Sequence, residues 1–187
     1  MPVRRAGRRA IRGTRLGVDG FAMFEVLVSL LLASVGVVAM AGLHGRAASM
    51  EMEANQRMQA LVLLQDMAER LGSNRAQGPA YLADGVGLAD RRDCTAAATL
   101  AERDLCEWSE RLRGASVVRG ERDAGAMIGA RGCIALAGDA RFVITVAWQG
   151  VVASAAPGAA CGRGDFGDEA LRRAVSTVVR IADLEAL

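Results

Sequence analysis

The chain has 187 residues, which is enough for one domain and an anchoring segment but too few for two domains of ordinary size. Its net charge of +2 is divided unevenly, because residues 1–20 carry +5 and leave −3 for the rest. A mildly acidic body excludes nucleic acid as an obvious electrostatic partner, so we expect no contact with nucleic acid.

A long apolar run follows six arginines at the start of the chain. The run covers residues 21–43, and Glu25 is its only charged residue. Its length fits the roughly 20 residues that cross a bilayer, and the preceding arginines are typical of a cytoplasmic flank. A secretory signal would have a core of about 7–15 residues with a cleavage site after it. We therefore expect a retained single-pass anchor.

Glu25 is the unusual residue of this run. A carboxylate within a membrane span costs about 2.5–3.5 kcal/mol at the centre and less near an end, so its presence suggests a function. The alternative is that Glu25 lies at the level of the lipid headgroups and has no partner.

The stretch GFAMFEVLVSLLLASVGVV at 20–38 resembles the class III leader junction of type IV pilins and type II secretion pseudopilins. The resemblance implies cleavage by a prepilin peptidase between Gly20 and Phe21, followed by N-methylation of Phe21. It also implies that Glu25 helps recruit the subunit into a filament by pairing with the terminal amine of a neighbour. A partner of opposite sign offsets part of the cost of a charge in apolar surroundings.

The apolar pattern continues beyond the run at a spacing of three to four residues, which predicts one helix from Phe21 to Leu71. Gly72 is expected to end this helix. We divide the chain into a leader peptide at 1–20, the transmembrane and assembly half of the helix at 21–43, and a globular head at 44–187. The head includes the second half of the helix.

The head is expected to begin with an irregular segment at 74–93. Thr99 and Glu102 form a capping-box pattern that opens a second helix, and Gly114 ends it. Alternating apolar residues predict short strands at 116–119 and 133–137 and longer strands at 141–149 and 173–182, with a hairpin turn at 138–139. The expected fold is α+β and type IV pilin-like: a long N-terminal helix packed on an antiparallel sheet, with a short extra helix in the connecting segment.

Three further stretches narrow the resemblance. They are DMAERLGSNR at 66–75, the pattern D-L-x-x-W at 104–108, and Cys133-Ile134 leading into VITVAW at 143–148. Together they resemble the PilV family of minor pilins, or type IV pilus modification proteins. The resemblance implies a minor pilin that enters or primes a type IV pilus and supports assembly, adhesion or motility. The implied partners are the prepilin peptidase, other major and minor pilins, and the inner-membrane assembly platform.

The implied location is the inner membrane, with the head in the periplasm, and then the cell-surface pilus. Two alternatives stay open. A pseudopilin of a type II secretion system would share the leader and the fold. A membrane-anchored periplasmic binding domain that never polymerises would keep an uncleaved N-terminus.

Four cysteines fit an exported head in an oxidising compartment. They allow three pairings, among which the sequence cannot choose. We favour Cys94–Cys106, which would close a loop onto the short helix, and Cys133–Cys161, which would tie two elements of the sheet together. Zinc is the rival, but the chain has no C-x-x-C pair, so we expect no metal site.

Enzymatic chemistry has little support in the sequence. The only histidine, His44, lies where the apolar run meets the polar half of the helix, so no His-based triad or His-rich metal site can form. No phosphate-binding loop occurs, and no dinucleotide fingerprint that follows a predicted strand and opens a predicted helix occurs. Asp165, Asp168 and Glu169 could gather Ca²⁺, but they read more simply as a solvated acidic loop. We expect no catalytic residues and no cofactor.

Overall fold

The computed structural model describes residues 23–88, 93–114, 118–119, 122–123, 127–138 and 140–181. The chain divides into two units, residues 1–44 and 45–187. The predicted cleavage site at Gly20 and Phe21 lies outside the described residues.

The first element is the helix α1, Met23–Ser73, which is continuous over 51 residues. It continues through Gly72 and ends at Ser73. The predicted stop at Gly72 is therefore wrong, although different methods commonly place a helix end one or two residues apart. The backbone N–H of Asn74 still donates to the carbonyl of Arg70 (3.0 Å). A 3₁₀ segment, η1, then follows at Arg75–Tyr81.

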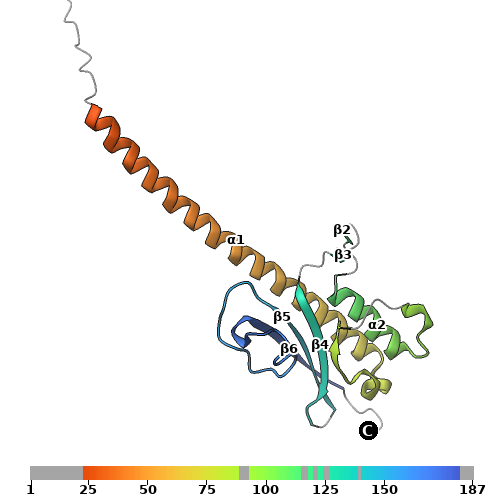
Figure 1. Ribbon diagram of the computed structural model, residues 1–187. Helices are drawn as coiled ribbons and strands as arrows, with labels where there is room; N and C mark the ends of the chain where they lie inside the picture. The colour runs from red at the N-terminus through yellow and green to blue at the C-terminus, as the bar shows by residue number, and fades with distance from the viewer. Residues whose placement is uncertain are drawn as a thin grey trace, which may run out of the picture. The chain divides into compact units, whose positions relative to one another are not determined.

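The head contains one four-stranded antiparallel sheet with the strand order β1-β4-β5-β6 (Figure 1). Its strands are β1 (Ala83–Val86), β4 (Ile128–Leu136), β5 (Arg141–Gln149) and β6 (Arg172–Arg180). Two further strands, β2 (Val118–Arg119) and β3 (Arg122–Asp123), pair only with each other. Short 3₁₀ turns, η2 (Cys94–Ala96) and η3 (Glu169–Leu171), precede the helix α2 (Leu100–Leu112) and the strand β6.

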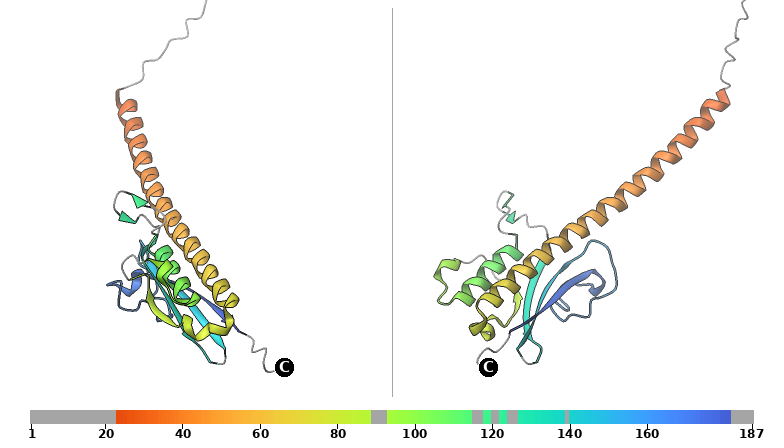
Figure 2. Two further views of the ribbon diagram at one scale, coloured as in Figure 1. Left: turned by 90° about the vertical axis from the view of Figure 1, so that its right-hand side faces the viewer. Right: turned by 180° about the vertical axis from the view of Figure 1, so that it is seen from behind.

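The helix α2, Leu100–Leu112, begins with the predicted capping box. The hydroxyl of Thr99 accepts from the Glu102 N–H (3.2 Å), and the Glu102 carboxylate accepts from the Thr99 N–H (3.2 Å). Two of the orphan N–H groups at the helix start are thereby satisfied. In the head, α2 and the second half of α1 lie on the same side of the sheet (Figure 2).

The main core lies between these two helices and the sheet. Trp108 connects three elements, because its indole Nε1 donates to the carbonyl of Leu63 in α1 (2.9 Å) and its ring lies over Gly132 of β4. A Cβ atom at Gly132 would come within 2.2 Å of that ring, so only glycine fits there. The buried residues of α1 and β5 in this core are Ala60, Leu64, Met67, Leu71, Phe142, Ile144, Val146 and Trp148.

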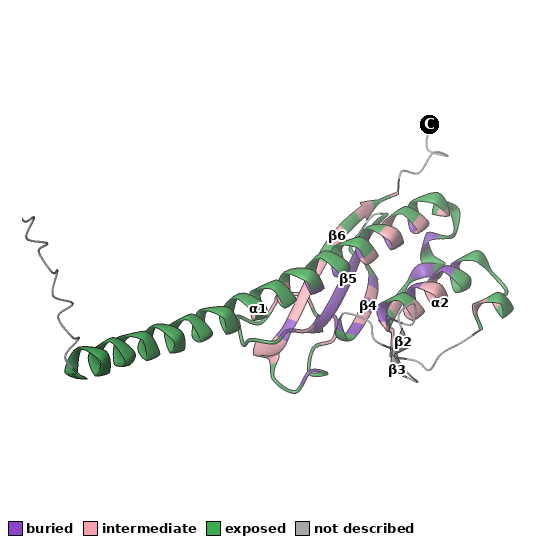
Figure 3. Cartoon of the chain, turned by 90° about the horizontal axis from the view of Figure 1, so that it is seen from above, coloured by how far each residue is buried: buried purple, intermediate pink, exposed green. Residues whose placement is uncertain are grey.

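The strand β5 has the bounds that the sequence predicts, but it is buried on both faces rather than one (Figure 3). The chain between β5 and β6 folds back over the outer face of the sheet. There Cys161 and Phe166 form a second small cluster with Ala147. The alternating pattern of β5 marks only the face toward the helices, because the residues on its other face, such as Thr145 and Ala147, are small or polar.

The other predicted elements differ at their edges. The irregular segment at 74–93 contains η1 and β1, and β1 was not predicted. The strand predicted at 133–137 starts earlier, at Ile128, and the one predicted at 116–119 forms part of the β2–β3 pair outside the main sheet. The predicted turn does join β4 to β5, with the Ala137 N–H donating to the Arg141 carbonyl (2.8 Å). Asp139 lies outside the described residues.

Candidate functional site

The first half of α1 exposes its apolar side chains. Large residues from Met23 to Leu43 are open to solvent, among them Leu30 at 62% and Val38 at 72% exposure. Within the described part of the chain, α1 is the one helix that is long and apolar enough to cross a membrane. Such a surface is costly in water and is favourable in lipid or against other apolar helices.

Glu25 lies in the first turn of this helix. Its side chain is exposed, and it makes no hydrogen bond or ion pair with any residue that the structure describes. Carboxylates near a helix N-terminus interact favourably with the helix dipole. In apolar surroundings this carboxylate would still need a cationic partner, and such a partner can come from another molecule.

His44 is also exposed on α1, one residue beyond the apolar run. The structure brings no other predicted site residue next to Glu25 among the described residues.

The head carries an ionic cluster between its two helices. Arg70 of α1 donates to Asp104 of α2 (Nη1–Oδ1 2.6 Å) and to Glu107 (Nη1–Oε2 2.9 Å), and it also pairs with Asp66 (3.2 Å). Burial opposes the charge on Arg70, yet its hydrogen bonds to Glu107 and Asp104 raise its pKa above the ordinary value. Tyr81 completes the cluster by donating its hydroxyl to Asp104 Oδ2 (2.5 Å).

Tyr81 is fully buried. Burial and the hydrogen bond to the Asp104 carboxylate raise the pKa of Tyr81 to about 12. A second hydrogen bond reaches its hydroxyl from the Asn74 amide (3.1 Å). The phenol thus ties the end of η1 to α2 and to Asn74, the residue that follows α1.

Both favoured disulfides are present. Cys94 pairs with Cys106 and joins η2 to α2, and Cys133 pairs with Cys161 and joins β4 to the segment between β5 and β6. No free cysteine occurs among the described residues, and all four cysteines are described. The pairing left open by the sequence is therefore the favoured one.

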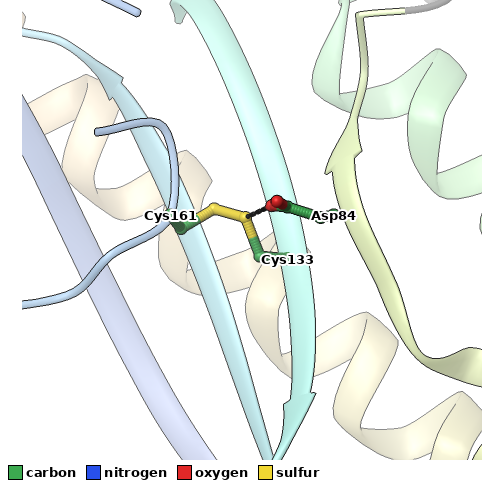
Figure 4. Close-up of side chains that lie close together, drawn as sticks. All are labelled: Asp84, Cys133 and Cys161. Carbon is green, nitrogen blue, oxygen red and sulfur yellow. Dashed lines mark hydrogen bonds between the residues drawn. A yellow bond between two sulfur atoms is a disulfide. The ribbon is translucent and has the colours of Figure 1, made fainter. Parts of the chain in front are cut away.

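Asp84 of β1 lies beside the second disulfide (Figure 4). Its Oδ1 approaches Cys133 Sγ at 2.9 Å, and the ligand atoms of Asp84, Cys133 and Cys161 lie within 4.8 Å of one another. Metal ions bind thiolates, whereas both sulfurs here are held in a disulfide. The three residues are a structural contact rather than a metal site.

Arg172 organises the segment that covers the outer face of the sheet. Only 1% of this residue is exposed, and its guanidinium donates to the carbonyls of Pro157 (3.1 Å), Ala159 (2.6 Å) and Cys161 (3.2 Å). Its charge is balanced by Glu169 (2.7 Å). A buried arginine whose donors are used in this way holds a loop that has no regular secondary structure.

The acidic residues that could have gathered Ca²⁺ are engaged separately. Asp165 pairs with Arg131, Asp168 accepts from the Ala170 N–H (2.9 Å), and Glu169 binds Arg172 and the Gly164 N–H (2.7 Å). Each of the three carboxylates thus has its own separate partners in the protein.

Sequence reasoning missed the residues that hold the head together. Asp104 left a signal, because it lies on the buried face of α2 with Ala101 and Trp108, where a carboxylate needs a partner. The sequence carries no such signal for Arg172, since its partners are backbone carbonyls 11 to 15 positions away.

Comparisons of the chain with protein-family models, with curated proteins and with solved structures find no match to it.

Proposed function

We propose that the chain is a minor pilin that enters or primes a type IV pilus after a prepilin peptidase cleaves it between Gly20 and Phe21. The observation that carries the proposal is Glu25, one carboxylate without a described partner at the start of an exposed apolar helix. A membrane anchor alone has no use for this charge, because an apolar residue would insert more easily.

The architecture of the head supports this function. The second half of α1 supplies Ala60, Leu64, Met67 and Leu71 to the core, so one continuous helix carries both the exposed apolar surface and the packed head. The α+β arrangement of a long helix on a four-stranded antiparallel sheet is compatible with a type IV pilin-like fold. Two disulfides suit a head that works outside the cytoplasm, in the periplasm and then on the pilus.

In this function Glu25 pairs with the amine at Phe21 of an adjacent subunit. The first half of α1 would lie in the inner membrane before assembly and among the helices of other pilins afterwards. Both surroundings exclude water, so the pairing of opposite charges favours one axial position of the incoming subunit over others.

Mass spectrometry of the protein recovered from membranes tests the proposal. We expect a mature chain that begins at Phe21 and carries an N-terminal methyl group. Gly20→Val should block leader removal, whereas Gly36→Val, the same change within the apolar run, should leave cleavage intact. A wild-type chain that keeps residues 1–20, or a Gly20→Val variant that is still shortened, would overturn the assignment.

The distribution of the mature protein separates the remaining candidates. A minor pilin should be found in sheared pili or with the pilus assembly platform. Recovery only with a secretin-type secretion complex would indicate a pseudopilin instead. A cleaved or uncleaved chain found only as a monomer in the inner membrane would indicate an anchored domain that does not polymerise.

A further inference from the structure

Asp84 of β1 lies against one sulfur of the disulfide Cys133–Cys161. Its Oδ1 is 2.9 Å from Cys133 Sγ, and Figure 4 shows this oxygen beyond that sulfur, on the side away from Cys161. A disulfide sulfur carries no proton, so it cannot donate a hydrogen bond to the carboxylate. The effect of the contact therefore has to be sought in the chemistry of the disulfide.

The Asp84 carboxylate has no cation beside it in the part of the chain that the structure describes. It makes no ion pair there, and its one close polar neighbour is the Cys133 sulfur. Exposed aspartates carry a negative charge at neutral pH. An uncompensated negative charge thus lies next to the disulfide.

Thiol reagents break a disulfide by exchange. A thiolate attacks one sulfur along the line of the S–S bond, and a new S–S bond forms as the old one breaks. The electron pair of the old bond leaves on the other sulfur, which then takes a proton from water. The rate depends on which sulfur can be reached and on how readily the other sulfur leaves as a thiolate.

Attack on Cys133 is obstructed by the Asp84 side chain. The attacking thiolate would have to approach Cys133 Sγ from the side away from Cys161, and this is where Figure 4 shows the Asp84 oxygen. At 2.9 Å no other atom fits between this oxygen and the sulfur. The thiolate and the carboxylate also repel each other, because both are negatively charged.

Attack on Cys161 is disfavoured for two other reasons. Only 7% of Cys161 is exposed, and it packs in a cluster with Ala147 and Phe166. This attack would also expel Cys133 as a thiolate, which would form directly beside the Asp84 carboxylate. A neighbouring like charge raises the free energy of a thiolate and makes it a poorer leaving group.

We propose that Asp84 protects the disulfide Cys133–Cys161 from thiol reductants and from enzymes that exchange disulfides through a thiolate. The segment between β5 and β6 then stays tied to β4 in the presence of such reagents. All of the residues involved belong to the unit 45–187, so the proposal does not depend on the pilin assignment.

The rate of reduction of each disulfide tests the proposal. The full chain in detergent micelles is treated with dithiothreitol, new thiols are alkylated with iodoacetamide at successive times, and peptide mass spectrometry follows the two disulfides separately. Asp84→Asn keeps the shape of the side chain but removes its charge, and it should speed reduction of Cys133–Cys161 about fivefold or more. Asp84→Ala also opens the line of attack and should speed it about tenfold or more.

Three controls make the result specific. Glu51→Gln removes an exposed negative charge from α1 and should leave both rates unchanged. The disulfide Cys94–Cys106 in the same molecules reports any opening of the whole head, and its rate should change by less than about twofold in either Asp84 variant. Added salt screens the repulsion, so it should speed reduction of Cys133–Cys161 more in the wild-type chain than in Asp84→Asn.

Two results would each overturn the proposal. In the first, Cys133–Cys161 is reduced as slowly in Asp84→Asn as in the wild-type chain, which would show that the charge of Asp84 gives no protection. In the second, both disulfides are reduced faster by the same factor, which would show a head that opens more easily rather than a disulfide that has lost its protection.

Discussion

Arg70 of α1 and Asp104 of α2 lie 34 positions apart in the chain and form a hydrogen-bonded ion pair of 2.6 Å in the interior of the head. Their side chains are 19% and 9% exposed. Tyr81 joins the pair from η1 through the second oxygen of the same carboxylate. One acidic residue thus connects three segments that are separate in sequence.

Breaking this ion pair should destabilise the head strongly. Removing one member of a buried pair leaves the other charge uncompensated, which costs about 3–5 kcal/mol. We expect Arg70→Met to lower the free energy of unfolding by about this amount, measured by urea unfolding in detergent with tryptophan fluorescence. Asp104→Asn should lower it by less, because Arg70 keeps Asp66 and Glu107 as partners. Glu51→Gln, an exposed site on α1, serves as the control.

The double variant Arg70→Met/Asp104→Asn should lose less stability than the two single losses added together, because both charges of the pair are then absent. Additive losses would show that the two side chains contribute separately. Single variants as stable as Glu51→Gln would show that the pair contributes nothing.

Tyr81 should titrate well above its ordinary range. The chain has one tyrosine and no lysine, and its cysteines are in disulfides, so this is the one side chain expected to titrate between about pH 9 and 12. The folded pKa of about 12 lies above the ordinary value of 10.0. The stabilisation is therefore complete below pH 10 and is lost as the pH rises toward 12.

The ultraviolet absorbance of the phenolate measures this titration directly. We expect a midpoint near pH 12 in the folded protein and near pH 10 in urea, together with a loss of stability over that interval on the order of 3 kcal/mol. Tyr81→Phe should be less stable at pH 7 and should show no such loss from pH 10 to 12. A folded midpoint near pH 10 would contradict the buried hydrogen bond with Asp104.

Arg172 should control the segment between β5 and β6. Arg172→Met leaves the carbonyls of Pro157, Ala159 and Cys161 without their donor, a loss of about 2–4 kcal/mol. Arg180→Met removes the same charge from an exposed position on the same strand and should change stability by less than about 0.5 kcal/mol. Hydrogen exchange should accelerate at residues 155–171 in the first variant only. Equal exchange in both variants would show that Arg172 does not hold the segment between β5 and β6.

Glu25 should be required for assembly but not for insertion or cleavage. In the proposed filament, Glu25→Leu leaves the amine of a neighbouring subunit unpaired, at a cost on the order of 3–5 kcal/mol if the pair is buried. Since about 1.4 kcal/mol corresponds to a tenfold change, incorporation should fall a hundredfold or more. The measurement is the amount of mature variant in sheared pili relative to the inner-membrane pool.

Ser29→Leu is the matched control for this prediction, because it adds the same apolar side chain one helical turn later without removing a charge. It should assemble normally. If Glu25→Leu assembles as well as Ser29→Leu, the carboxylate has no part in assembly, and its place near the headgroups becomes the better explanation.

Elements with a complete local pattern could be predicted from the sequence. The long helix, the capping box at Thr99 and the bounds of β5 all depend on residues within a few positions of one another. Glu25 could be singled out in the same way, because its contrast with the apolar run is itself local. The four cysteines allow three disulfide pairings, and the sequence does not choose among them. The tertiary structure does, because it brings Cys94 to Cys106 and Cys133 to Cys161.

The start of β4 shows why the rest could not be predicted. Gly132 interrupts the alternating pattern and reads as a break before Cys133, yet in the fold it is the one residue that leaves room for the ring of Trp108. The strand therefore continues on both sides of an apparent breaker. Because Trp108 lies 24 positions earlier, the residues around Gly132 do not show why a glycine is needed there.

Local patterns in the sequence determined the two helices and two of the strands. A capping box marks where a helix begins, and a repeating pattern records which side of one element is apolar. The tertiary structure alone decided the strand order, the short strand β1, the burial of the outer face of β5, the donors of Arg172 and the approach of Asp84 to the second disulfide. These features arise from contacts between segments that lie far apart in the chain, and such contacts place no constraint on the order of neighbouring residues.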